Sequence, residues 1–168
     1  MKPGVTVTKD DTAKVLASIR AMSREKVLVG VPAPNARRRN EDGKYLDPID
    51  NAALGYVHEN GSPRAHIPPR PFLIPGVRYA APKFLPVLRA AAQEGFRDGN
   101  AVHVGLARAG LVAVSTVKQY LKSLALNGAA QLAESTLKAR KRQGFQGESP
   151  LIRTGQLLNS LTFVVRKK

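Results

Sequence analysis

The sequence contains no cysteine in its 168 residues. This absence excludes disulfide bonds, thiolate metal sites and cysteine nucleophiles, and it agrees with a reducing compartment. No continuous apolar run of about 18 residues occurs, so we predict neither a membrane span nor membrane binding. The opening segment MKPGVTVTKDD has no apolar stretch of the kind found in signal peptides, so no signal peptide is predicted.

Signatures of catalysis are also missing. The sequence has no Walker-type phosphate loop, no G-x-G-x-x-G and no G-x-S-x-G pattern. His58 is not followed by a second histidine at helical spacing, and a metal site built from His58 and His66 would need ligands that the chain does not offer. We therefore predict no enzymatic activity, no catalytic residue, no cofactor, no metal and no small-molecule substrate.

Acidic residues are scarce. Asp and Glu number 12 against 27 Lys and Arg, which gives a net charge of +15, and residues 71–168 carry 15 basic side chains against 4 acidic ones. A field of this strength attracts a polyanion or an acidic protein surface. Simple solubility is the plainer interpretation of the same excess.

Hydrophobic spacing predicts a mixed chain. Alternating or β-branched residues predict strands at 5–8, 26–31 and 161–166. Apolar residues three and four apart, together with capping residues, predict helices at 12–22, 51–61, 86–97, 102–126 and 129–142. Pro82 and Pro86 predict a kinked or broken helix over 76–85, because each removes a backbone donor.

These elements predict one α+β domain over 1–168. Its core is expected to be a small antiparallel or mixed sheet of about three to four strands, packed with several helices. A polar segment with an Asp-Gly turn signal predicts a protruding loop at 35–49.

Two basic clusters are candidate binding surfaces. Arg37, Arg38 and Arg39 form a triplet in the protruding loop, and the second cluster consists of Lys138, Arg140, Lys141 and Arg142. The nine aromatic residues are not interleaved with basic ones, as a base-stacking surface would need. A sequence-independent contact with DNA phosphates remains an alternative function, but a sequence-specific reader is not supported.

Three segments carry a resemblance. They are ALGYVHENG at 53–61, IPPRPFLI at 67–74 and PLIRTGQLLNS at 150–160. In this order and spacing they resemble the tail-completion and neck proteins of long-tailed bacteriophages, the virion morphogenesis or minor tail component family. The matching positions are Val29-Gly30, Glu59 with Gly61, Arg70-Pro71-Phe72 and Thr154-Gly155. The loop at 35–49 is not part of that pattern.

The resemblance implies a structural virion protein made in the bacterial cytoplasm. It would form a homo-oligomeric ring, six- or twelve-fold, at the head–tail junction. Its partners would be further copies of itself and the adjacent neck, connector and tail proteins, with possible non-specific contact to the genomic DNA in the channel. The alternative is a basic, sequence-independent nucleic-acid-binding protein.

The proline segment, residues 67–74, has two interpretations. Such a segment is already extended before assembly, so it loses little entropy on docking. The planar guanidinium group of Arg70 can bind a carboxylate or carbonyl, and Phe72 and Leu73 can serve as an apolar anchor. The candidate subunit or partner contacts are these three residues and the triplet Arg37, Arg38 and Arg39. In the second interpretation the segment only covers the core of its own chain.

The second basic cluster, Lys138 to Arg142, is expected to face either DNA or an acidic neighbouring ring. Protein partners are preferred, because a strongly attractive lumen would resist DNA ejection.

Overall fold

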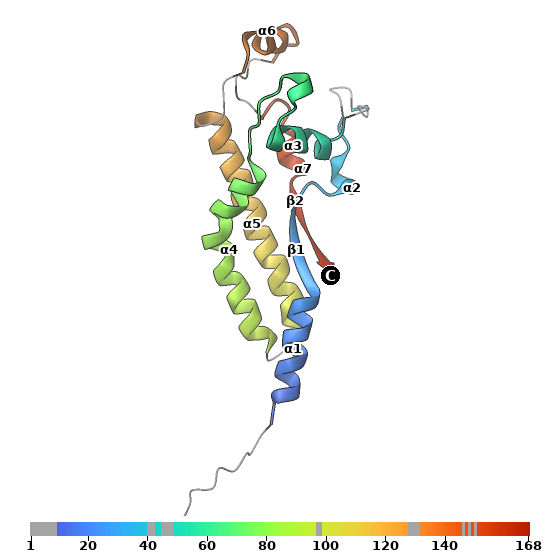
Figure 1. Ribbon diagram of the computed structural model, residues 1–168, viewed down its shortest axis with the longest axis vertical. Coiled ribbons are helices and arrows are strands. Elements are labelled where there is room, and N and C mark those ends of the chain that lie inside the picture. The colour runs from blue at the N-terminus through green and yellow to red at the C-terminus, as the bar shows by residue number, and fades with distance from the viewer. Residues whose placement is uncertain are drawn as a thin grey trace, which may run out of the picture.

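The computed structural model describes an elongated molecule of helices with one small sheet (Figure 1). The described residues are 10–39, 43–44, 49–96, 99–127, 132–145, 147, 149 and 151–168. The main elements are α1 (Thr12–Arg24), β1 (Glu25–Gly30), α2 (Ala33–Ala36), α3 (Asn51–Asn60), α4 (Leu73–Gly95), α5 (Gly99–Asn127), α6 (Glu134–Arg142), α7 (Gln156–Ser160) and β2 (Thr162–Lys167). The expected α+β class is confirmed.

The sheet pairs a strand from the N-terminal part of the chain with the last strand. Strands β1 and β2 pair antiparallel, with Glu25 opposite Lys167 and Gly30 opposite Thr162. These are two of the three predicted strands, and the third, at 5–8, lies outside the described residues. The sheet packs on α5 so closely that a Cβ at Gly110 would overlap the ring of Phe163. The absence of a side chain at position 110 therefore allows the close approach of β2.

Helices α4 and α5 form a long hairpin (Figure 1). A Cβ added at Gly105 would overlap Ala91 of α4, so small residues set the close spacing of the pair. Of the kinked or broken helix predicted over 76–85, the break is wrong, because α4 runs as one helix from Leu73 to Gly95. Pro82 and Pro86 are both exposed, so the carbonyls that lose an N–H partner can be hydrated, and packing against α5 supports the helix on both sides of the prolines.

The core lies at the end of this hairpin nearest α3 and α7. Its buried side chains come from α4, α5 and the segments around α7: Phe72, Ala80, Val117, Leu121, Leu151, Leu157 and Leu161. On α5, Val117 and Leu121 face this core, whereas Arg108 and Lys122 are exposed. One helix segment, Ala101–Leu126, is long and apolar enough to cross a membrane by length and composition. Its most apolar window is 44% buried in the protein.

Helix α1 extends beyond the sheet (Figure 1), and its apolar stripe is partly exposed. Val15, Leu16 and Ile19 lie on one side of the helix at helical spacing, and they are 38%, 47% and 46% exposed. The side of α1 that faces the body instead carries Ser18, which is buried. An amphipathic helix ordinarily buries its apolar stripe, and the described part of the chain covers this one only in part.

Candidate functional site

The end of α3 reverses the chain by means of a glycine. Asp50 accepts a hydrogen bond from the N–H of Ala53 at 2.7 Å and caps the start of the helix. Gly61 ends it with φ of 76°, and its N–H donates to the Val57 carbonyl. A Cβ at Gly61 would lie 2.9 Å from both the Ile67 oxygen and the Pro69 nitrogen. Position 61 therefore accepts only glycine without strain.

Glu59 ties the proline segment to the start of α4. Its carboxylate accepts hydrogen bonds from the backbone N–H groups of Phe72, Leu73 and Ile74, at 2.7, 2.8 and 3.0 Å. These donors have no partner within a helix, so the carboxylate satisfies them and opposes the positive end of the helix dipole. The Arg70 N–H adds a 2.6 Å bond to the His58 carbonyl. The segment is thus held across the end of α3.

Phe72 lies in the core of its own chain. Its side chain is 2% exposed, and both Phe72 and Leu157 lie within van der Waals reach of a Cβ built at Gly55. Leu73 is half-buried against the same core, while Ile74 is 57% exposed. Segments 53–61 and 67–74 and the described residues 151–160 therefore meet at one place. Burial in the core accounts for Phe72 without a partner subunit.

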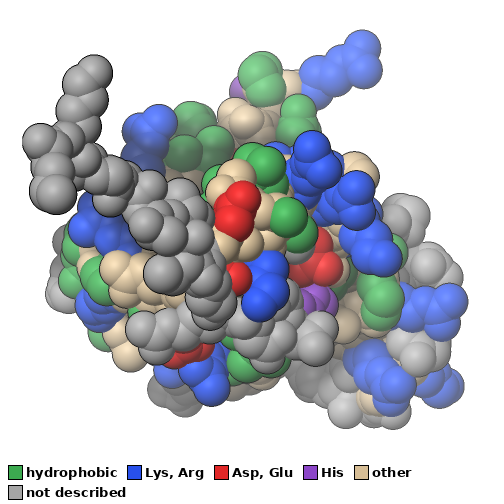
Figure 2. All heavy atoms as spheres, turned by 90° about the horizontal axis from the view of Figure 1, so that it is seen from below, with side chains coloured by type: hydrophobic (Ala, Val, Ile, Leu, Met, Phe, Trp, Pro, Cys, Tyr) green, Lys and Arg blue, Asp and Glu red, His purple; other side chains and the backbone are tan. Residues whose placement is uncertain are grey.

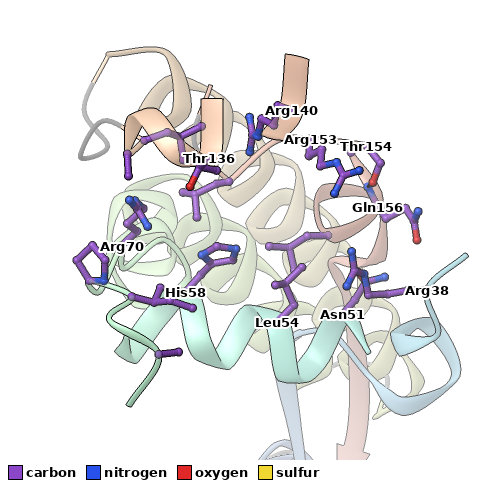
Figure 3. Close-up of a pocket in the computed structure, with 18 of the residues that line it drawn as sticks. Arg38, Asn51, Leu54, His58, Arg70, Thr136, Arg140, Arg153, Thr154 and Gln156 are labelled. Atoms are coloured by element: carbon purple, nitrogen blue, oxygen red, sulfur yellow. Dashed lines mark hydrogen bonds between the residues drawn. The ribbon is translucent and has the colours of Figure 1, made fainter. Parts of the chain in front are cut away.

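A cavity of about 620 Å³ opens between α3, the proline segment, α6 and the turn before α7 (Figure 3). Four arginines line it: Arg38, Arg70, Arg140 and Arg153. His58 and His66 also line it, and none of the described lining residues is acidic. In Figure 3, His58 points from α3 into the space, with Arg70 on one side and Arg140 opposite. The cavity is therefore a concentration of positive charge.

The electrostatics of the cavity act on His58. Burial lowers the pKa of His58 below its ordinary value, and the charges of Arg70, Arg140 and Arg38 lower it further. Burial also lowers the pKa of Arg140, with a contribution from Arg153. The site thus favours a neutral imidazole among guanidinium groups.

Local contacts fix the arginines in place. One Arg140 nitrogen, Nη1, donates to the carbonyls of Gly147 and Ser149 at 3.1 and 2.9 Å. Arg153 stacks over the Phe145 ring, 4.5 Å from its centroid. The side-chain amide of Gln156 exchanges two hydrogen bonds with the backbone of Arg39, at 2.9 and 2.5 Å. This pair holds the chain next to Arg38 against the turn that begins α7.

Three buried polar atoms at the cavity have no hydrogen-bond partner within the described chain. They are Arg38 Nε, Asn51 Oδ1 and His58 Nδ1. Asn51 is only 2% exposed, and it lies two helical turns before His58 on the same side of α3. Buried polar groups in proteins are ordinarily satisfied, so these atoms indicate a site that a polar ligand can complete.

The structure brings together part of the predicted surface. One arginine from each candidate group, namely Arg38, Arg70 and Arg140, lines the cavity. The other basic candidates are exposed and lie outside it: Arg37, Arg39, Lys138, Lys141 and Arg142. Lys138 contacts Glu134 at 3.6 Å.

Sequence reasoning missed Asn51, His58 and Arg153 as members of the site. The seven-residue spacing of Asn51 and His58 on a predicted helix was the one available signal. No group of metal-ligating side chains occurs among the described residues. Comparison of the chain with protein-family models, curated proteins and solved structures finds no match.

Proposed function

We propose that the chain is a ring-forming structural subunit of the phage head–tail junction and has no catalytic role. The partly exposed apolar stripe of α1 is the observation that carries this proposal. Val15, Leu16 and Ile19 remain between 38% and 47% exposed in an isolated chain, whereas a contiguous apolar patch on a soluble protein typically marks an interface.

A second copy is the occupant that this stripe best fits. Charge would repel two copies that carry +15 each, so an apolar contact is needed to hold them together. Figure 2 views the molecule from the end that carries α1, and basic side chains are spread around that face with few acidic ones among them. A head-to-tail contact through α1 closes into a ring when the rotation between copies closes.

The resemblance gains support from how its three segments pack. Glu59 and Gly61 shape the path of the proline segment, while Gly55 leaves room for Phe72 and Leu157. Glu59, Gly61 and Phe72, which match the phage neck pattern, therefore join α3 to the start of α4, next to Leu157 of α7. A shared structural framework is what a family of ring subunits would keep.

Size-exclusion chromatography with light scattering tests the proposal. We expect the wild-type protein to elute as an oligomer and Ile19→Asp to elute as a monomer, because a buried carboxylate at the contact is unfavourable. Ala17→Asp is the matched control, since Ala17 is exposed on the opposite side of α1. Equal elution of wild type, Ile19→Asp and Ala17→Asp would contradict assembly through this stripe.

A further inference from the structure

The arginine-lined cavity combines positive charge with apolar walls. Its charged side chains come from four separate segments, and its apolar lining consists of Leu54, Ile67, Pro68, Leu132, Leu151 and Leu157. Gathering guanidinium groups in a half-buried space costs free energy through desolvation and mutual repulsion. An anionic group bound between them would offset that cost.

We propose that the cavity binds a short acidic peptide segment of a partner protein, in which carboxylate side chains alternate with apolar ones. Guanidinium groups present paired donors that match a carboxylate, so Arg38, Arg70 and Arg140 are suited to it. The leucine-rich wall takes the neighbouring apolar side chain. A volume of about 620 Å³ accommodates a few residues of such a segment.

The unpartnered atoms favour a peptide over a nucleic acid. Asn51 Oδ1 is a buried acceptor that needs a donor, and a peptide N–H supplies one whereas a phosphodiester does not. No Phe, Tyr or Trp lines the described cavity, so it offers no such ring for a base to stack on. Arg38 Nε is a donor that the carboxylate satisfies. The same ligand therefore completes both groups.

This inference is independent of ring formation. An acidic segment of any partner would satisfy the same side chains, and the cavity lies at the opposite end of the molecule from α1 (Figure 1). Loss of assembly in the Ile19→Asp variant would leave peptide binding unchanged. Peptide binding and ring formation can therefore be disproved independently of each other.

Fluorescence anisotropy at about 150 mM salt provides the test, because weak surface electrostatics are screened there. The probe is a fluorescein-labelled octapeptide of alternating glutamate and leucine. The comparison probes are the same peptide with glutamine for glutamate, and an oligothymidylate of equal length. We expect saturable binding of the glutamate peptide, at least about tenfold tighter than of either comparison probe.

Paired variants locate the binding. Arg38→Gln and Arg140→Gln should each weaken the glutamate peptide about tenfold. Their controls, Arg37→Gln and Arg142→Gln, make the same charge change at exposed neighbours outside the cavity and should weaken it less than about twofold. Circular dichroism checks folding. If Arg140→Gln fails to fold because its backbone contacts are lost, the comparison of Arg38→Gln with Arg37→Gln decides the test.

Two outcomes would overturn the proposal. Equal losses in the cavity variants and in their controls would mean that the peptide responds only to net charge. Tighter binding of the oligothymidylate, lost in Arg38→Gln and retained in Arg37→Gln, would reassign the cavity to phosphate.

Discussion

The carboxylate of Glu59 accepts the backbone N–H of Phe72 at 2.7 Å, across 13 residues of chain. The same carboxylate accepts the N–H groups of the next two residues. One side chain at the end of α3 thus fixes where α4 begins, and it places Phe72 in the core. The proline-rich segment between them is held at both ends.

Removal of this carboxylate should be costly. Glu59→Ala leaves three backbone donors without their acceptor, and we expect it to lower the free energy of unfolding by about 3 kcal/mol. Glu59→Gln keeps one acceptor oxygen and should lose about half as much. Urea unfolding measures both, with Glu94→Ala, at an exposed site in α4, as control. A change in Glu59→Ala no larger than in Glu94→Ala would contradict this role.

Substitutions at Gly61 and Gly144 distinguish the cost of an unfavourable backbone conformation from the cost of a steric clash. Both have positive φ, 76° and 78°, but only Gly61 has backbone atoms within 3 Å of the missing Cβ. Gly144→Ala should lose about 1 kcal/mol of stability from the backbone conformation alone. Gly61→Ala should lose at least about 1 kcal/mol more, because the chain reversal must also shift. Equal thermal unfolding temperatures for the two variants would refute the close approach.

The structure predicts a stability defect for Phe72→Ala. Truncation of a ring that is 2% exposed leaves a cavity in the core and should lower the free energy of unfolding by about 3–5 kcal/mol. Ile74→Ala, two residues later and 57% exposed, should change it by less than about 0.5 kcal/mol. Chemical denaturation compares them. A stable Phe72→Ala monomer that fails to assemble would instead place Phe72 at a subunit contact.

Helix positions were predictable because periodicity and capping are local properties. The ranges of α1, α3 and α5 agree with the apolar spacing and with caps such as Asp50. The continuity of α4 was not predictable, since solvent exposure of its prolines and packing on α5 decide it. These are tertiary effects, which no local pattern contains.

The cavity was only partly foreseeable. The sequence predicts Arg38, Arg70 and Arg140 as members of three separate candidate groups, and these groups are far apart along the chain. Their meeting depends on the Gly61 reversal and on the contact of Gln156 with Arg39. The role of His58 in the cavity is not visible in the sequence, because its burial and its arginine neighbours arise only in the fold.

Acidification should destabilise the protein through His58. Burial and the charges of Arg70, Arg140 and Arg38 lower the pKa of His58 in the folded state, so the unfolded state binds the proton more readily. The stabilising contribution is complete above about pH 6.5, the ordinary histidine value, and decreases as the pH falls through the lower folded pKa. Unfolding free energies of wild type and His58→Gln between pH 8 and pH 5 measure it. Parallel curves for the two proteins would rule out a contribution from His58.

The most direct test of the ring proposal is negative-stain electron microscopy of the purified wild-type protein, with native mass spectrometry on the same sample. The account predicts closed rings whose mass is an integral multiple of the chain mass, with six- or twelve-fold symmetry. A uniform population of monomers of 18.1 kDa at every concentration would contradict it.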